Sequence, residues 1–77
     1  MDEVLKFANT LNYSYKFNSC KMLLSNWNGS KIYLVDSEAE KNLYLGWPTM
    51  IRETNGKFEE VQNNKEKLKI MNAADAA

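Results

Sequence analysis

The side chains that most often perform catalysis are sparse in this chain. It contains no histidine, which removes Ser-His and Cys-His nucleophile pairs and the usual proton carrier near neutral pH. Two close carboxylate pairs remain, Glu38 with Glu40 and Glu59 with Glu60. Either pair would need burial to shift a pKa far enough for acid–base catalysis, yet both lie among polar residues. We interpret them as solvated surface charges and predict that the protein is not an enzyme; a carboxylate-dependent enzyme is the weakest alternative.

The sequence also lacks the usual ligand sets for metals and cofactors. With one cysteine and no histidine, zinc binding has no support. The three glycines are isolated from one another, which excludes a glycine-rich phosphate loop. Cys20 lies beside Met22 and Leu23 without an activating partner, so we interpret it as a structural side chain. We predict neither a metal nor a cofactor.

Residue types that are common at protein–protein contacts surround the single proline. They are Tyr44, Trp47, Pro48, Met50 and Arg52. Because proline interrupts a strand, the ring of Trp47 could project out of the regular ladder. Arg52, the only arginine, would add a planar donor suited to carboxylate or aromatic partners. We predict that these five residues form a binding surface; the alternative is that Trp47 closes one end of the core.

A small interaction or regulatory module is therefore the function that the sequence predicts. Its partner would be another protein, of unknown identity, or a second copy of the chain. A small sheet leaves its edge strands open, and few charges protect residues 43–45 against edge-to-edge pairing. A homodimer is one expectation that follows.

Nucleic-acid binding is the main alternative function. Tyr13, Tyr15 and Phe17 alternate with polar residues, and an aromatic strand face can stack the bases of a single strand. Three nearby lysines could contact phosphates: Lys16, Lys21 and Lys31. However, ten basic residues balance ten acidic ones, so the chain lacks the positive charge that drives phosphate binding. Alternating aromatics are also the ordinary core face of a strand, and we prefer that interpretation.

The hydrophobic pattern that must position these residues predicts an α+β fold. We expect a small, mostly antiparallel sheet of about five strands, flanked by an N-terminal and a C-terminal helix. Helical spacing predicts the first helix over residues 2–11, and the aromatic alternation predicts a strand over residues 12–17. An alternative is that residues 12–27 continue the first helix. We expect both helices to cover the same face of the sheet.

Two Asn-Gly pairs predict tight hairpin turns, Asn28-Gly29 and Asn55-Gly56, because this pair suits the positive φ angles of such turns. The strands predicted around them cover residues 21–27, 31–36, 43–53 and 57–61. The third of these strands is expected to break at residues 46–48, where Gly, Trp and Pro follow one another.

The size of the chain predicts one domain. Seventy-seven residues are too few for two cores, so residues 1–72 should form a single unit with a frayed tail over residues 73–77. The last helix is expected over residues 63–72. A lone cysteine, an acidic start at Asp2 and Glu3, and no long apolar run predict a cytoplasmic protein without membrane contact.

Overall fold

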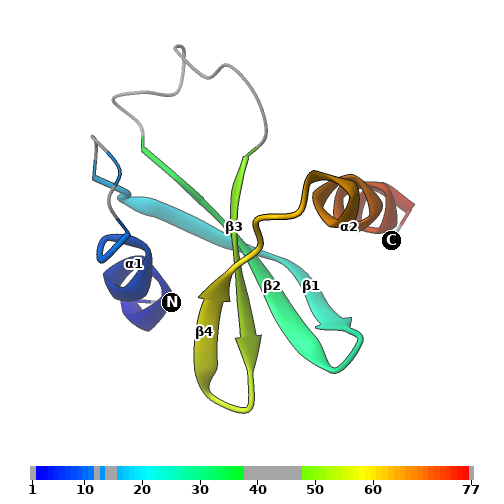
Figure 1. Cartoon of the computed structure of the whole chain (residues 1–77), viewed down its shortest axis with the longest axis horizontal. Coiled ribbons are helices and arrows are strands. Elements are labelled where there is room, and N and C mark those ends of the chain that lie inside the picture. Colours follow the sequence, from blue (N-terminus) through cyan, green and yellow to red (C-terminus); the bar gives the residue numbers. More distant parts are fainter. Residues whose placement is uncertain (1, 12, 14–15, 38–47, 77) are drawn as a thin grey trace.

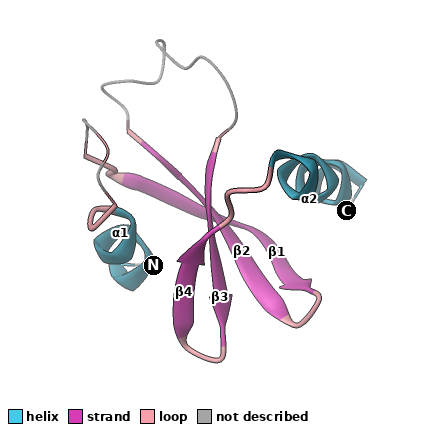
Figure 2. Ribbon diagram, viewed as in Figure 1, coloured by secondary structure: helices cyan, strands magenta, loops and turns pink. Residues whose placement is uncertain are grey.

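The computed structural model describes residues 2–11, 13, 16–37 and 48–76. Its helices and strands, in chain order, are α1 (Asp2–Ala8), β1 (Ser19–Trp27), β2 (Ser30–Asp36), β3 (Thr49–Thr54), β4 (Lys57–Glu60) and α2 (Asn64–Ala76). Each strand pairs antiparallel with the next, in the order β1-β2-β3-β4 (Figure 1; Figure 2). The α+β class is confirmed, but the sheet within these residues has four strands, whereas about five were predicted.

Both predicted Asn-Gly turns are confirmed. Asn28 and Asn55 each have a φ of 52°, and the glycines that follow them have φ angles of 87° and 80°. Asparagine and glycine tolerate this left-handed region better than other residues, so the two turns follow from local chemistry alone. They connect β1 with β2 and β3 with β4.

The strand predicted over residues 12–17 is absent at the residues of this range that the structure describes, 13, 16 and 17. Residues 16–18 have no regular structure, and α1 ends at Ala8, so the alternative of one long helix is wrong as well. The carboxamide of Asn9 takes the place of a neighbouring strand: its Oδ1 accepts from Phe17 N at 2.7 Å and its Nδ2 donates to Phe17 O at 2.9 Å. The backbone of Phe17 is thus satisfied without a ladder while its ring is buried.

The two helices cover opposite faces of the sheet, which corrects the expectation that they share one (Figure 1). Tyr33 and Val35 pack in the cluster that contains α1, whereas Ile32 and Leu34 pack in the cluster that contains Ile70 of α2. A four-residue apolar run in a strand cannot be buried from one side, because successive side chains point to opposite faces. We call these sides the α1 face and the α2 face.

Two irregularities in β1 turn its apolar residues toward α2. Relative to β2, the strand gains a residue between Met22 and Leu24 and again between Leu24 and Trp27. Bulges of this kind redirect the side chains that follow them. As a result Leu23, Leu24 and Trp27 all pack against the core cluster beneath α2.

The C-terminal helix is longer than the sequence predicted. It begins at Asn64 and continues to Ala76, through the residues for which a frayed tail was expected. Alanines at three of the last four helical positions, which are strong helix formers, account for the extension. Within the described part of the chain, no helix has the length and apolar character needed to cross a membrane.

Candidate functional site

Three of the five residues predicted to bind a partner lie in the described part of the chain. Pro48 is half-buried, and Met50 is 0% exposed and belongs to the cluster beneath α2. Met50 is therefore a core residue and not an outward-facing contact. Arg52 lies two positions further along β3 on the same face. Tyr44 and Trp47 lie outside the described residues, so their part of the predicted surface stays a prediction.

Pro48 and Met50 meet in a small cavity between the sheet and α2, which we call the apolar pocket. It has a volume of about 110 Å³. Its lining residues come from β1, β2 and β3, from the residue before β3 and from the last turns of α2: Leu23, Leu34, Pro48, Met50, Met71, Ala74 and Asp75. All of them except Asp75 are apolar.

The size of the apolar pocket limits what it can hold. Sites for small-molecule ligands usually enclose about 300–1,000 Å³, so this cavity, at about 110 Å³, is too small for one. It can take a single apolar side chain. Two of its walls are Met50 and Met71, and methionine side chains adapt easily to partners of different shape.

The rim of the apolar pocket carries negative charge. Asp75 is exposed, and its carboxylate makes no ion pair or hydrogen bond with any residue the structure describes. It also lies in the last turn of α2, where the backbone carbonyls contribute further negative charge and no basic side chain is present. A cation close to the pocket would therefore be favoured.

Arg52 has partners inside the protein. Its Nη2 donates to Glu66 Oε1 at 2.5 Å, and its Nε lies 3.2 Å from Glu59 Oε1 in an ion pair without hydrogen-bond geometry. Trp27 Nε1 donates to the other oxygen of Glu66 at 3.2 Å. The hydrogen bond from Arg52 is the main cause that holds the pKa of Glu66 below its usual range. These four side chains, which we call the Arg52 cluster, tie α2 to β1 and β3, so Arg52 is engaged within the fold.

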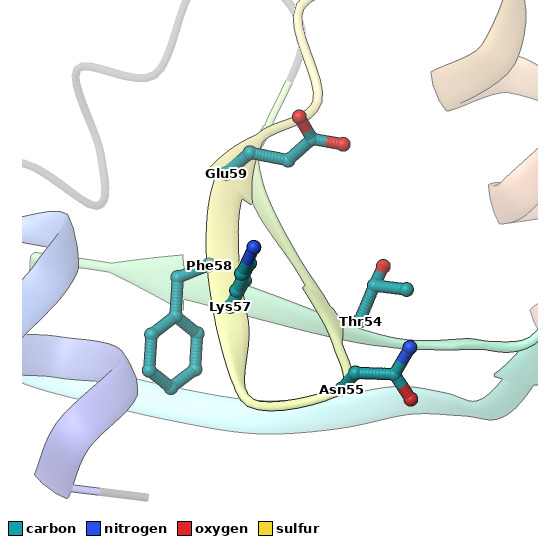
Figure 3. Close-up of a pocket in the computed structure, with 5 residues that line it drawn as sticks. All are labelled: Thr54, Asn55, Lys57, Phe58 and Glu59. Atoms are coloured by element: carbon teal, nitrogen blue, oxygen red, sulfur yellow. The ribbon is translucent and has the colours of Figure 1, made fainter.

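A larger hollow lies at the turn between β3 and β4 (Figure 3). It has a volume of about 490 Å³ and is lined by Thr54, Asn55, Lys57, Phe58 and Glu59. Figure 3 shows Phe58 and Glu59 on opposite sides of β4, with Phe58 directed toward α1. All five residues belong to one hairpin and their polar groups do not converge on a common point, which a specific ligand site requires.

The carboxylate pair on β4 does not act as a pair. Successive side chains of a strand point to opposite faces, and Glu59 accordingly pairs with Arg52 while Glu60 accepts a hydrogen bond from the Tyr13 hydroxyl. Shared proton chemistry between Glu59 and Glu60 therefore has no geometric basis. The other pair, Glu38 and Glu40, lies outside the described residues.

The aromatic residues proposed as a base-stacking platform are placed differently. Phe17 is buried, and the ring of Tyr13 meets it edge-on with centroids 5.4 Å apart. Tyr15 lies outside the described residues. A stacking face needs exposed rings, and the two described rings do not form one.

Cys20 lies half-buried against the α1-face cluster. Burial raises the pKa of its thiol, which lowers the fraction of reactive thiolate. The interpretation of Cys20 as a structural side chain agrees with this environment. In the described part of the chain, no group of three or more His, Cys, Asp or Glu side chains is placed to hold a metal ion.

Sequence reasoning missed the walls of the apolar pocket. Counting outward from the Asn28 turn pairs Leu23 with Leu34, but the two irregularities in β1 shift the register, so that Leu34 lies opposite Lys21. Met71 and Ala74 are three residues apart, the spacing that puts two side chains on one side of a helix. No local signal indicated that this side of α2 would face β3.

Comparison of the chain with protein-family models, with curated proteins and with solved structures finds no match. A function for this protein must therefore be argued from the geometry of its own sites. Of the two hollows described above, the apolar pocket is the one whose lining side chains come from several elements and converge on one space.

Proposed function

We propose that this protein is a non-enzymatic interaction module that binds another polypeptide through the apolar pocket. The partner inserts one apolar side chain against Met71, above the buried Met50, and places a basic residue beside Asp75. The observation that carries the proposal is the match between a cavity of about 110 Å³ with apolar walls and the size of one aliphatic side chain.

The expected contact is weak and reversible. Full burial of a Leu or Met side chain contributes about 1.5–3 kcal/mol, less than the cost of association for two free molecules. The pocket therefore acts as an anchor within a wider contact surface. Residues 44 and 47, predicted from the sequence to belong to that surface, lie close in the chain to Pro48 at the pocket's edge.

The negative charge at the rim of the apolar pocket favours a basic residue next to the inserted side chain. Asp75 and the carbonyl end of α2 both favour a cation within a few ångströms of the pocket. A Lys or Arg next to the inserted side chain satisfies this, whereas an acidic neighbour would be repelled. A second copy of the chain is one partner that could supply such a segment, since the sequence contains ten basic residues.

The methionine methyl groups offer a direct test. The chain has four methionines, of which Met50 and Met71 line the apolar pocket while Met22 lies on β1 away from it. The protein would be labelled at its methionine methyls and titrated with short capped peptides that carry a central Leu flanked by Lys, a central Leu flanked by Glu, or a central Gly flanked by Lys. We expect the Leu-Lys peptide to shift the Met50 and Met71 resonances and to leave Met22 unchanged.

Three variants make the test specific. Ala74→Leu fills the apolar pocket from within and should abolish the peptide response, while Leu68→Ala, on the same helix but outside the pocket lining, should not change it. Asp75→Asn should remove the preference for Lys over Glu. Shifts of all methyl groups alike, or an undiminished response in Ala74→Leu, would contradict the proposal. If the Met50 and Met71 resonances move with protein concentration alone, the occupant is a second copy.

A further inference from the structure

The two Asn-Gly turns share a sequence and a backbone conformation but differ in one hydrogen bond. At both turns the asparagine φ is 52° and the glycine φ is close to 80° or 90°. The space that a Cβ atom would occupy is open at Gly29 and at Gly56 alike. Gly29 N, however, donates to Asn26 Oδ1 at 3.0 Å, whereas Gly56 N has no hydrogen-bond partner among the residues described.

This difference matters because Asn-Gly is the dipeptide most prone to spontaneous deamidation. The glycine amide nitrogen loses its proton to hydroxide and attacks Cγ of the preceding asparagine. The new N–Cγ bond closes a five-membered imide, the bond from Cγ to Nδ2 breaks, and ammonia leaves. Water then opens the imide at either carbonyl and yields aspartate or isoaspartate, so one water is consumed for each ammonia released.

We propose that Asn55 is a site of spontaneous deamidation in the folded protein and that Asn26 protects Asn28 from the same reaction. The attacking nitrogen at the second turn, Gly56 N, donates to no acceptor in the described part of the chain, whereas Gly29 N must first break its bond to Asn26. Asn55 is also exposed and projects from the end of the hairpin (Figure 3). One net hydrogen bond corresponds to about fivefold in rate, and this is the expected difference between the turns.

Deamidation of Asn55 would change the hairpin in two ways. A carboxylate would join Glu59 on the lining of the hollow at this turn, and the formal net charge of the chain would fall from 0 to −1, because one neutral side chain becomes an acid. Isoaspartate also adds a backbone atom, which a two-residue turn cannot accommodate. The β4 strand has four residues and lies at the sheet edge, so its pairing with β3 should weaken.

The test compares both turns in one molecule. The purified chain would be kept at mildly alkaline pH, cleaved after Lys and Arg, and the mass increase from amide to acid followed in the fragments 53–57 and 22–31, with fragment ions to locate it. The same measurement in urea supplies the intrinsic rate of each site. After this normalisation we expect Asn55 to react about fivefold faster than Asn28 in the native protein.

Two variants at position 26 test whether the Asn26 side chain protects Asn28 from deamidation. In Asn26→Ala, Asn28 should accelerate to the rate of Asn55, while Asn26→Asp, which keeps an acceptor oxygen, should remain protected. The Asn55 rate within each variant reports any general loosening of the fold, since that would raise both sites together. Equal normalised rates in the wild type, or an Asn28 rate that Asn26→Ala does not change relative to Asn55, would overturn the proposal.

Discussion

The two faces of the sheet are covered in different ways. On the α1 face, Val4 and Ala8 of the helix close over Tyr33, Val35 and Ile51, and every one of these side chains is less than 10% exposed. On the α2 face, the helix packs mainly against β1 and leaves the apolar pocket open. The core residues of both faces are buried, and the difference is that the α2 face carries an open apolar pocket beside its helix.

The chemistry of the two helices explains this difference. The seven-residue α1 places small and apolar residues on the sheet, and Phe7 adds a ring contact to Phe58 with centroids 5.6 Å apart. The thirteen-residue α2 buries Lys67 together with Ile70, and Glu66 holds it to the sheet through charge. A helix fixed partly by polar contacts requires fewer apolar residues beneath it, and openings remain beside it.

The largest expected effect concerns two neighbours on β3 that face opposite ways. Ile51 lies in the closed α1-face cluster and Met50 borders the apolar pocket, and both are 0% exposed. Ile51→Ala should cost about 4 kcal/mol of unfolding free energy, and Met50→Ala about 2 kcal/mol, because the site beside an existing cavity is already less completely packed. Urea denaturation of both variants measures the difference. A larger loss for Met50→Ala would show that the α2 face is the better packed one.

The Arg52 cluster gives the next largest effect. Arg52→Ala removes two ion pairs and leaves Glu66 with Trp27 as its remaining partner. Since the Arg52 side chain is 19% exposed, we expect a loss of about 2 kcal/mol, below that of a fully buried pair. The matched control is Glu59→Ala: its side chain is 68% exposed, so its ion pair should contribute less than about 1 kcal/mol. If Arg52→Ala and Glu59→Ala lost equal amounts of unfolding free energy, the contact between Arg52 and Glu66 would not be the source of the stabilisation.

The start of α2 provides a smaller test of how this face is held. Asn63 Oδ1 accepts from Glu66 N at 3.0 Å and caps the helix. Asn63→Ala should therefore cost about 1 kcal/mol. Asn64→Ala, one position later and exposed, should change the unfolding free energy by less than about 0.5 kcal/mol. Thermal unfolding of the two variants beside the wild type gives the comparison, and a cap without effect would mean that α2 is held by its side-chain contacts alone.

The hairpins could be predicted from local chemistry, whereas features that depend on contacts between distant residues could not. The Asn-Gly turns placed the turn-side ends of all four observed strands to within one residue, because Asn and Gly themselves favour positive φ angles. A strand was predicted over residues 12–17 because three aromatic residues spaced two positions apart were interpreted as one face of a strand. Its backbone partner is the side chain of Asn9, eight residues before Phe17, and no periodicity indicates such a bond.

The candidate site was predictable only in part for the same reason. Pro48 and Met50 were identified by residue type, and both line the apolar pocket. Arg52 was also identified, but its partner Glu66 lies fourteen residues away on another element. The apolar run in β2 could have shown that both faces need cover, and hence that the helices lie on opposite sides.

Titration gives the smallest of these effects, since it leaves every side chain in place, and it should act on the two faces at opposite ends of the pH scale. On the α2 face, the hydrogen bond from Arg52 holds the pKa of Glu66 below its ordinary 4.5. This contribution to stability is complete above pH 4.5 and is lost as pH falls through the lower folded-state pKa. On the α1 face, burial and the hydrogen bond to Glu53 raise the pKa of Tyr33 above 10, and burial raises that of Cys20.

For Tyr33 and Cys20 the dependence of stability on pH has the opposite sign. The neutral forms are favoured in the folded state, so stability is complete below the unfolded pKa values and is lost as pH rises through the folded ones. Urea midpoints measured across pH should therefore fall at both ends. Glu66→Gln should flatten the acid side and leave the alkaline side unchanged, while Tyr33→Phe should reduce the alkaline slope alone, with the contribution of Cys20 remaining. If either substitution altered both ends equally, the two faces would be coupled and could not be treated as independent.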